Sequence, residues 1–494
     1  MINTILLIRP EVEVGKKEFP FGILYIATVL KNKYRVRILD LNIYPDKESE
    51  VEDFLESNPG AMLAVSALSG SYSWVKQITL RIKNKLPETK IVIGGHIAEM
   101  YELLLKNTGA DFISLGEGEE MLPELINRLN TGGDLREVPG IAFLKDGEIV
   151  RTSIKLLKEF VLPDLTLIDP KDYFIHPARD MFFAKSQKYR AREREDDKLA
   201  AVIFSRGCLG ACNYCYRHLP GHRQPAVEWC WKYLMDLYEN YGVRYFRIDD
   251  ELFTSNKEWF NQFYEKIKEA KIDILFRITG LRVDSIDNDL LAKLSEIGCI
   301  AINYGLESGS PEILKNMNKR TTVDQNKAAV NKTLAHGINA MAYIMLGYEG
   351  ETNETLYETM DMLLDTDIDA DYVSVFFTIP LPGTRLFKNC LARGLIRDEE
   401  LFMEDIFDKI GSQEERYLVQ LGEVTKEEMV GFRYKLIFLL RLKRIISKKG
   451  WLFKLIKKVI KAIPNKCRIN KIFSFGQKVL NRFIKKFPAL AGNK

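Results

Sequence analysis

Three cysteines within eight residues are the part of this 494-residue chain whose type and spacing point most directly to chemistry. Cys208, Cys212 and Cys215 stand in the stretch SRGCLGACNYCYR, and the whole chain has only seven cysteines. Thiolates at this spacing can surround one metal centre, and soft sulfur ligands select zinc or iron–sulfur clusters. The sequence therefore predicts a metal centre held by a single loop.

Two kinds of metal site are compatible with three cysteines. A structural zinc ion requires a fourth ligand, which His218 or His222 could supply. A [4Fe–4S] cluster bound by three cysteines leaves one iron open to a substrate or cofactor. Structural zinc usually stabilises a small loop-rich module, whereas these cysteines follow the first strand of a large domain. We therefore favour the cluster, and a zinc-stabilised binding module without redox chemistry is the alternative.

The composition is that of a folded protein with more than one domain, because 46% of residues are hydrophobic, 28% are charged and 494 residues exceed one ordinary core. The start of the chain, MINTILLIRPEVEV, lacks the pattern of a secretory signal, so we expect a cytoplasmic location. In that reducing compartment clustered cysteines usually bind metals or catalyse. The scattered ones are expected to be small buried residues: Cys230, Cys299, Cys390 and Cys467.

Residues 1–140 alternate short apolar runs with helical patterns, as in TILLI, FGILYIATVLKN, VRILDL and MLAVSAL. Such alternation predicts a doubly wound, Rossmann-like α/β domain with a parallel sheet. Ligands bind such sheets at the carboxyl ends of the strands. The residues expected there are Ser66, Ser69, Gly94, Gly95, Gly116, Glu117 and Gly118. Tight turns without a ligand are the alternative, and the lack of GxGxxG after the first strand disfavours a nicotinamide site.

The next two regions are expected to be a linker and a barrel. Residues 141–198 are rich in Pro and Asp and include the charge run KSQKYRAREREDD, which is typical of a solvated linker. Residues 199–395 contain six strand–helix pairs, which favour a partial or closed β/α barrel over an open sheet. Because barrel chemistry lies at the carboxyl ends of the strands, the polar residues and glycines found there are expected to share one mouth with the cysteine loop.

Several motifs make the chain resemble the radical S-adenosylmethionine (SAM) superfamily. The pattern C-x3-C-x2-C, with Tyr214 before the last cysteine, is similar to the signature of that superfamily. YGLESGSPEILKNMNK, YIMLGYEGETNET and PLPGTRLF resemble the later strand ends of members with an N-terminal cobalamin (B12)-binding domain. FPFGILYIATVL, VRILDLN, IVIGGHIAE and FISLGEGEEMLPELI are similar to that cobalamin domain. The resemblance covers the chain from its first residue to about residue 400.

The resemblance implies three cofactors, namely a [4Fe–4S] cluster, SAM and cobalamin. Cys208, Cys212 and Cys215 would bind three irons, and the amino and carboxylate groups of SAM would chelate the fourth. One electron from an external donor such as flavodoxin or ferredoxin would cleave SAM to methionine and a 5′-deoxyadenosyl radical. That radical abstracts hydrogen from an unactivated carbon. The protein would supply positioning and electrostatics, while the cofactors carry the difficult chemistry.

The resemblance also implies binding residues for SAM and cobalamin. The residues expected to contact SAM are Tyr214, Asp249, Asp250, Glu251, Arg282, Gly305, Glu307, Ser308 and Gly347. Two aspartates replace the glycines of the superfamily's GGE motif, and for Glu307 and Arg282 a buried ion pair is the alternative. The strand-end residues of the first domain would contact cobalamin. The chain has no DxHxxG motif, so we expect cobalt without a histidine ligand and do not assign His96 that role.

Residues 396–494 are expected to form a helical region with a basic amphipathic tail. From Gly431 onward there are 19 Lys and Arg and no Asp or Glu, whereas 53 basic residues face 68 acidic ones upstream. Apolar residues and cations at helical spacing are typical of a helix on an anionic membrane surface, and no apolar run is long enough to span a bilayer. An intramolecular lid is the alternative, and a nucleic-acid patch is disfavoured.

The resemblance implies an enzyme of the radical SAM class. The expected reaction is cobalamin-dependent methyl transfer to an unactivated carbon of a small molecule, or of a lipid or isoprenoid delivered at the inner membrane surface. The alternative within the superfamily is ring closure, C–C coupling or another oxidative rearrangement without methyl transfer.

Overall fold

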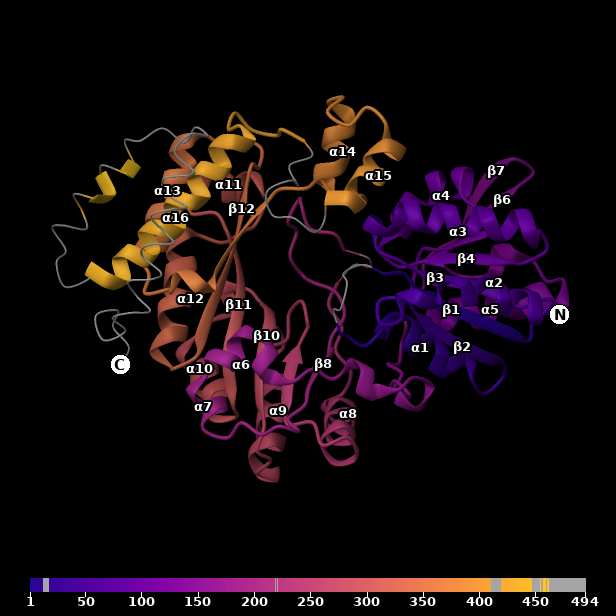
Figure 1. The fold of residues 1–494 in the computed structure, drawn as a ribbon, viewed down its shortest axis with the longest axis horizontal. Coiled ribbons are helices and arrows are strands. Elements are labelled where there is room, and N and C mark those ends of the chain that lie inside the picture. Colours follow the sequence, from indigo (N-terminus) through magenta and orange to yellow (C-terminus); the bar gives the residue numbers. More distant parts are fainter. Residues whose placement is uncertain are drawn as a thin grey trace.

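The structure is a computed structural model that describes residues 1–11, 17–217, 219, 221–409, 419–446, 454, 456–458 and 460–461. Two sheets, each covered by helices, form the body of the chain. The first sheet lies at the right of Figure 1, and the second, with its outer helices, lies at the left. This arrangement confirms the α/β fold class predicted from the sequence.

The first sheet has seven strands in the order β2-β1-β3-β4-β5-β6-β7. Strands β1 to β5 pair in parallel, and β6 and β7 add an antiparallel hairpin at one edge. The strands are β1 (Thr4–Arg9), β2 (Arg35–Asp40), β3 (Met62–Ser66), β4 (Ile91–Gly94), β5 (Phe112–Ser114), β6 (Ile141–Lys145) and β7 (Glu148–Arg151). The sheet therefore extends past residue 140, where the first domain was expected to end.

Helices cover both faces of this sheet. They are α1 (Phe21–Leu30), α2 (Glu50–Ser57), α3 (Tyr72–Lys85), α4 (Tyr101–Asn107) and α5 (Gly118–Thr131). Successive residues of a strand point to opposite faces, so Ile5 and Leu7 pack with α1 and α5 while Leu6 and Ile8 pack with α2 and α3. A strand buried on both faces reads as a continuous apolar run, which explains TILLI. Each such side chain stabilises the fold by about 1.5–3 kcal/mol.

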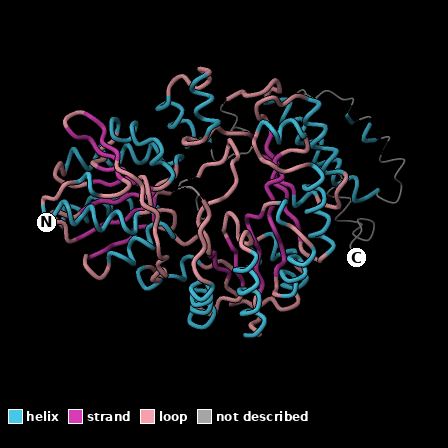
Figure 2. Tube along the Cα trace, turned by 180° about the vertical axis from the view of Figure 1, so that it is seen from behind, coloured by secondary structure: helices cyan, strands magenta, loops and turns pink. Residues whose placement is uncertain are grey.

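The second sheet has six parallel strands in the order β13-β12-β11-β10-β9-β8. Among the described residues the two edge strands do not pair with each other, so the barrel is partial, as predicted. The strands are β8 (Leu199–Val202), β9 (Tyr245–Ile248), β10 (Leu275–Leu281), β11 (Cys299–Glu307), β12 (Asn339–Leu346) and β13 (Val373–Phe377). The helices between and after them are α8 (Val227–Asn240), α9 (Lys257–Ala270), α10 (Asn288–Glu296), α11 (Pro311–Asn316), α12 (Val323–Ala335), α13 (Asn353–Leu364) and α14 (Arg385–Ala392). Figure 2 shows from behind that helices lie outside these strands.

The segment expected to be a solvated linker packs against the barrel. It contains the short helices α6 (Met181–Lys185) and α7 (Gln187–Arg190), and its aromatic residues Tyr173, Phe183 and Tyr189 are buried in the barrel core. Arg277 of β10 donates to Asp180 at 2.8 Å, which fixes the segment to the sheet. The charged residues dominated the sequence pattern, whereas the aromatic residues before and within the charge run determine the packing.

Helix α15 (Glu399–Lys409) ties the end of the barrel to the first domain. It packs against α3 and the 3-10 turn η2 (Ser69–Ser71), and in Figure 1 it lies with α14 between the two sheets. Glu400 accepts hydrogen bonds of 2.7 Å from Tyr72, Lys76 and Asn107 of the first domain. Helix α15 thus links the end of the barrel to the first domain.

Helix α16 (Lys426–Ile446) is the described start of the basic tail, and it packs against α13. Its apolar residues Leu436, Leu439 and Leu440 are buried in the same core as Leu356 and Leu363 of α13. Its cations pair with acidic residues of the body, as in Arg444–Asp369 and Arg441–Asp371 at 2.5 and 3.4 Å. This part of the tail therefore packs on the body of the same chain, as expected for an intramolecular lid and not for a helix on a membrane surface.

Within the described residues, no helix is both long enough and apolar enough to cross a bilayer. Three aromatic residues of the basic tail, Trp451, Phe453 and Phe473, could face a membrane surface if the tail is helical, and they lie outside the described residues.

Candidate functional site

A cavity of about 370 Å³ lies between the carboxyl ends of the two sheets. Ser66, Gly94 and Ser114 line it from the ends of β3, β4 and β5. Ser205, Asp249 and Glu251 line it from the loops after β8 and β9 of the barrel. Its volume lies in the range of small-molecule sites, and its position is where a parallel sheet binds ligands. Neither domain alone builds this cavity.

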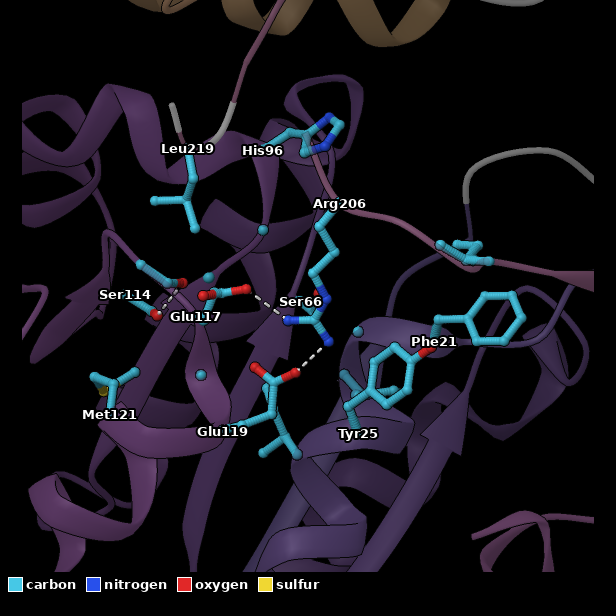
Figure 3. A pocket seen from close by; sticks show the side chains of 18 of the residues that line it. Phe21, Tyr25, Ser66, His96, Ser114, Glu117, Glu119, Met121, Arg206 and Leu219 are labelled. Carbon is cyan, nitrogen blue, oxygen red and sulfur yellow. Dashed lines mark hydrogen bonds and ion pairs between the residues drawn. The ribbon is translucent and has the colours of Figure 1, made fainter. Parts of the chain in front are cut away.

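Six of the seven residues expected to contact cobalamin line the cavity, and Figure 3 shows several of its lining side chains. These six are Ser66, Gly94, Gly95, Gly116, Glu117 and Gly118. Ser69 is not among the described lining residues, because it belongs to η2, which packs against α15. Gly95 has φ of 86°, and a Cβ there would lie 2.5 Å from the Ala67 carbonyl oxygen, so the backbone itself requires glycine.

An arginine from the barrel reaches into the cavity and joins the two domains. Arg206 donates to Glu117 at 2.7 Å and to Glu119 at 2.6 Å, and both carboxylates are nearly inaccessible to solvent (Figure 3). The guanidinium also lies 4.9 Å from the ring centroid of Tyr25 on α1 and 5.3 Å from that of Phe160. Ion pairing combined with aromatic contact suits a buried arginine, whose planar group can do both.

Glu117 is the centre of this ion-pair network. Arg223 donates to both of its carboxylate oxygens at 2.9 Å, and the Leu157 backbone N–H donates at 2.7 Å. Burial raises the pKa of Glu117, but the hydrogen bonds from Arg223, Leu157 and Arg206 outweigh burial, and the pKa lies below its ordinary value. The Glu117 side chain is therefore ionised and committed to the two arginines.

The cysteine loop starts from a tightly fixed backbone. Arg206 and Arg223 exchange two backbone hydrogen bonds of 2.9 Å. Gly207 has φ of 82°, and a Cβ there would lie 2.3 Å from the Gly221 carbonyl oxygen, so only glycine fits this crossing. The far side of the loop is held by α11, because Asn213 donates its backbone N–H to the Met317 carbonyl at 2.9 Å.

The sulfurs of Cys208 and Cys212 lie close to one point beside Gly210. A Cβ at Gly210 would be 3.3 Å from the first sulfur and 3.8 Å from the second. Burial raises the pKa of Cys208. Loss of hydration around the sulfur, together with the neighbouring Cys212, raises the pKa of Cys215 to about 12, while the residue as a whole is exposed. Metal ligation requires thiolates, so metal binding here releases protons. Cys208, Cys212 and Cys215 supply the soft donor atoms from one loop that an iron–sulfur cluster requires.

Of the two histidines considered for a zinc site, His222 lies within the described residues. His222 makes a hydrogen bond of 3.0 Å with the Ser255 hydroxyl, and burial lowers its pKa. His218 lies outside the described residues. Among the residues that the structure describes, no group of three His, Cys, Asp or Glu side chains is arranged to hold a single metal ion.

The three acidic residues after β9 lie in different surroundings. Asp249 lines the cavity and accepts hydrogen bonds from Arg247 at 2.7–2.8 Å. Asp250 is fully buried and accepts the Phe204 backbone N–H at 2.6 Å, and burial raises its pKa to about 7. Glu251 lines the cavity, and burial raises its pKa. Asp249 and Glu251 can therefore meet a ligand, while Asp250 supports the backbone before the cysteine loop.

Glu307, at the end of β11, forms a buried ion pair. Lys319 donates to Glu307 at 3.0 Å and to the Tyr214 hydroxyl at 3.2 Å. The Lys319 and Glu307 side chains are 11% and 10% exposed. A Cβ at Gly305 would lie 3.1 Å from the Lys319 ammonium and 2.3 Å from the Glu307 carboxylate, so this glycine makes room for the pair. In this structure Glu307 therefore forms the buried ion pair that was considered as the alternative to SAM binding, and its partner is Lys319.

The other residues expected to bind SAM serve local contacts here. Arg282 pairs with Asp284 at 2.8 Å, close to the Cys208 and Cys212 sulfurs. The Ser308 hydroxyl is buried at 3.1 Å from that of Thr359, and the Gly347 N–H donates to Glu351 at 2.5 Å. These residues thus lie near the carboxyl ends of the barrel strands, and their contacts hold the loops there in place.

Sequence reasoning missed four residues of this site. They are Glu119, Arg206 and Arg223, whose ion pairs join the two domains, and Lys319, whose partner Glu307 lies 12 residues earlier in the chain. The available signals were local: Arg206 stands two places before the first cysteine, and Lys319 ends the motif YGLESGSPEILKNMNK. Neither signal identifies the partner, which for Arg206 lies in the other domain and for Lys319 is Glu307 of the same motif.

Comparison with family models places two known domains on this chain. Residues 202–363 match the model of the radical SAM superfamily, and residues 12–126 match the model of the B12 binding domain. The first match covers most of the barrel and the second covers β2 to β5 of the first sheet, and the cavity lies between these two parts. The matches account for the predicted [4Fe–4S] cluster, SAM and cobalamin as cofactors.

Two curated relatives span most of the chain. An uncharacterized methyltransferase of Pyrococcus horikoshii is 26% identical over 409 residues, which are 80% of this chain and 84% of that protein. An anaerobic magnesium-protoporphyrin IX monomethyl ester cyclase of Synechocystis sp. is 29% identical over 393 residues, which are 76% of this chain and 74% of that protein. The two names describe different reactions on a related sequence.

A solved structure has the same fold over nearly the whole chain. The cobalamin-dependent SAM radical enzyme OxsB, with aqua-cobalamin and SAM bound, superposes with a TM-score of 0.72 at 17% identity. The match covers 98% of this chain and 80% of OxsB. At this identity the likeness establishes the shared fold.

Proposed function

Because the chain belongs to the radical SAM superfamily and carries an N-terminal B12-binding domain, we propose that it is a cobalamin-dependent methyltransferase acting on an unactivated carbon. The name of the Pyrococcus relative supports methyl transfer. The observation that carries the proposal is the cavity that adjoins both the first sheet and the cysteine loop. When bound, cobalamin supplies a methyl carrier, and SAM at the cluster supplies a methyl donor and a radical source.

The residues of this chain would hold and orient these groups. Cys208, Cys212 and Cys215 would bind three irons of the cluster, and Glu251, which lines the cavity, would meet the ammonium group of SAM. The small residues at the ends of β3 to β5 would let cobalamin approach the backbone. The ion pairs of Arg206 would keep the two halves of the cavity in register, which is the positioning role expected of the protein.

For the substrate we propose a small molecule that enters between the two domains, with an external one-electron donor as partner. A lipid substrate delivered at a membrane surface would need an exposed apolar face on the basic tail. The described part of α16 buries that face against α13, so these residues give the lipid proposal no support.

Anaerobic reconstitution tests the proposal. Wild-type protein should bind about four irons and four sulfides and take up cobalamin, and each of C208A, C212A and C215A should lose the cluster. C390A, which removes a buried cysteine of α14, is the matched control and should keep it. With a reductant and SAM, S-adenosylhomocysteine should form together with 5′-deoxyadenosine. Colourless protein with stoichiometric zinc would contradict the proposal that the chain is a radical SAM enzyme.

A second candidate function is oxidative ring closure without methyl transfer. The relative that is 29% identical and named as a cyclase favours it. The assay separates the two candidates, because ring closure should give 5′-deoxyadenosine and methionine without S-adenosylhomocysteine. SAM with a deuterated methyl group adds a second readout, since label should enter the product only under methyl transfer.

A further inference from the structure

We propose that the buried pair Lys319 and Glu307 tunes the reduction potential of the cluster, with Lys319 raising it and Glu307 lowering it. The inference rests on the proposed function in one respect, namely that the cysteine loop holds a [4Fe–4S] cluster. It assigns an electrostatic role to two residues of the barrel mouth that supply no ligand atom to the irons.

The pair is isolated from solvent and fixed in place. Its N–O distance is 3.0 Å, and the two side chains are 11% and 10% exposed. Glu307 adopts φ of 62°, a left-handed conformation that is uncommon for a residue with a side chain. Gly305 leaves the space that both charged groups occupy. Tertiary contacts therefore hold a strained residue in the position where it meets the ammonium group.

The pair is attached directly to the cysteine loop. The Lys319 ammonium lies 3.2 Å from the hydroxyl of Tyr214, which stands between the second and third cysteines. One residue earlier, the Asn318 side chain donates to the Ala211 carbonyl at 2.7 Å. The Lys319 carbonyl accepts from Arg282 at 3.1 Å. Three successive anchors fix the ammonium relative to the sulfurs.

The sign of the effect follows from the charge that reduction adds. The cluster gains one negative charge when it accepts an electron from the external donor, and a nearby cation stabilises the reduced form more than the oxidised form. Fixed charges act strongly in a site shielded from water, where the effective dielectric constant is far below that of water. Net charge and solvent exposure are among the factors that set iron–sulfur potentials. Removing Lys319 should lower the potential, and neutralising Glu307 should raise it.

The experiment is a redox titration of the reconstituted cluster in wild-type, K319M, E307Q and K319M/E307Q protein, without SAM or substrate. The signal of the reduced cluster in electron paramagnetic resonance is followed against a dithionite-poised potential. We expect K319M to shift the midpoint downward and E307Q to shift it upward. The double variant, which removes both charges, should return toward the wild-type value.

Two further variants separate charge from structure. K319R keeps the cation and should stay close to wild type, and K315M removes an exposed cation of α11 and should leave the midpoint unchanged. Shifts of the same sign in K319M and E307Q, or no shift in either, would overturn the proposal. Loss of iron from both single variants would also overturn it, because the pair would then be purely structural. If wild-type protein binds no iron and sulfide, the proposed function itself fails.

Discussion

Arg206 Nη2 lies 2.6 Å from Glu119 Oε1, so a residue two places before the first cysteine is bound to the first turn of α5 in the other domain. The Glu119 side chain is 6% exposed, and that of Arg206 is 21% exposed. A contact of this kind couples the position of the cysteine loop to the position of the cavity wall. It also gives the interface between the domains a charged centre within largely apolar surroundings.

Replacing Arg206 by methionine should destabilise the whole protein. The change leaves Glu117 and Glu119 buried near each other with one fewer cation, and breaking a buried ion pair typically costs about 3–5 kcal/mol. Urea unfolding of the protein without added cobalamin measures the difference. R81M is the matched control, because Arg81 makes exposed ion pairs, which contribute about 1 kcal/mol or less. Equal effects of the two changes would contradict the role given to Arg206.

Filling the cavity should block cobalamin. Ser66, at the end of β3, lines the cavity, and a phenylalanine there would occupy space that the ligand needs. We expect S66F to weaken cobalamin binding at least about tenfold, the equivalent of about 1.4 kcal/mol, while iron content stays unchanged. S66A preserves the space and should bind nearly as well as wild type. Binding is followed by the cobalamin absorption spectrum after gel filtration, and normal retention by S66F would refute the site.

Glu351 should make the stability of the protein depend on pH. Burial raises its pKa from 4.5 to about 7, so the folded state favours the protonated form. The contribution is fully present below pH 4.5 and is lost as the pH rises through 7, by about 3 kcal/mol at about 1.4 kcal/mol per pKa unit. Urea unfolding at several pH values should show this fall relative to E351Q. If the free energy of unfolding changed with pH in the same way for wild type and E351Q, the prediction would be wrong.

The packing of α16 against α13 predicts that the start of the basic tail belongs to the folded core. Leu436 is fully buried there, and a Leu-to-Ala change in a core costs about 2–5 kcal/mol. L436A should lower the free energy of unfolding by that amount, whereas E427A at an exposed position of the same helix should change it by less than about 1 kcal/mol. If L436A left the free energy of unfolding unchanged, α16 would not pack against α13 in solution.

The sequence alone predicted the architecture because the determining signals are local. Apolar runs such as TILLI alternate with amphipathic helices, and that period directly indicates parallel sheets. The cysteine spacing is a feature of one loop, so the metal centre and the resemblance could be inferred without any tertiary contact. The boundary at residue 140 and the linker were harder to predict, because a short antiparallel hairpin and a few buried aromatic residues leave weak patterns.

Only the tertiary structure decided which polar and charged side chains meet. Arg206 and Glu119 are 87 residues apart in the chain, and Lys319 and Tyr214 are 105 apart. No local periodicity encodes such pairs, because they depend on how two separately wound sheets face each other and on which side chains lose contact with water there. The sequence by itself determined the two domains and the cysteine loop. The docking of the domains determined the cavity, its ion pairs and the charges around the cysteines.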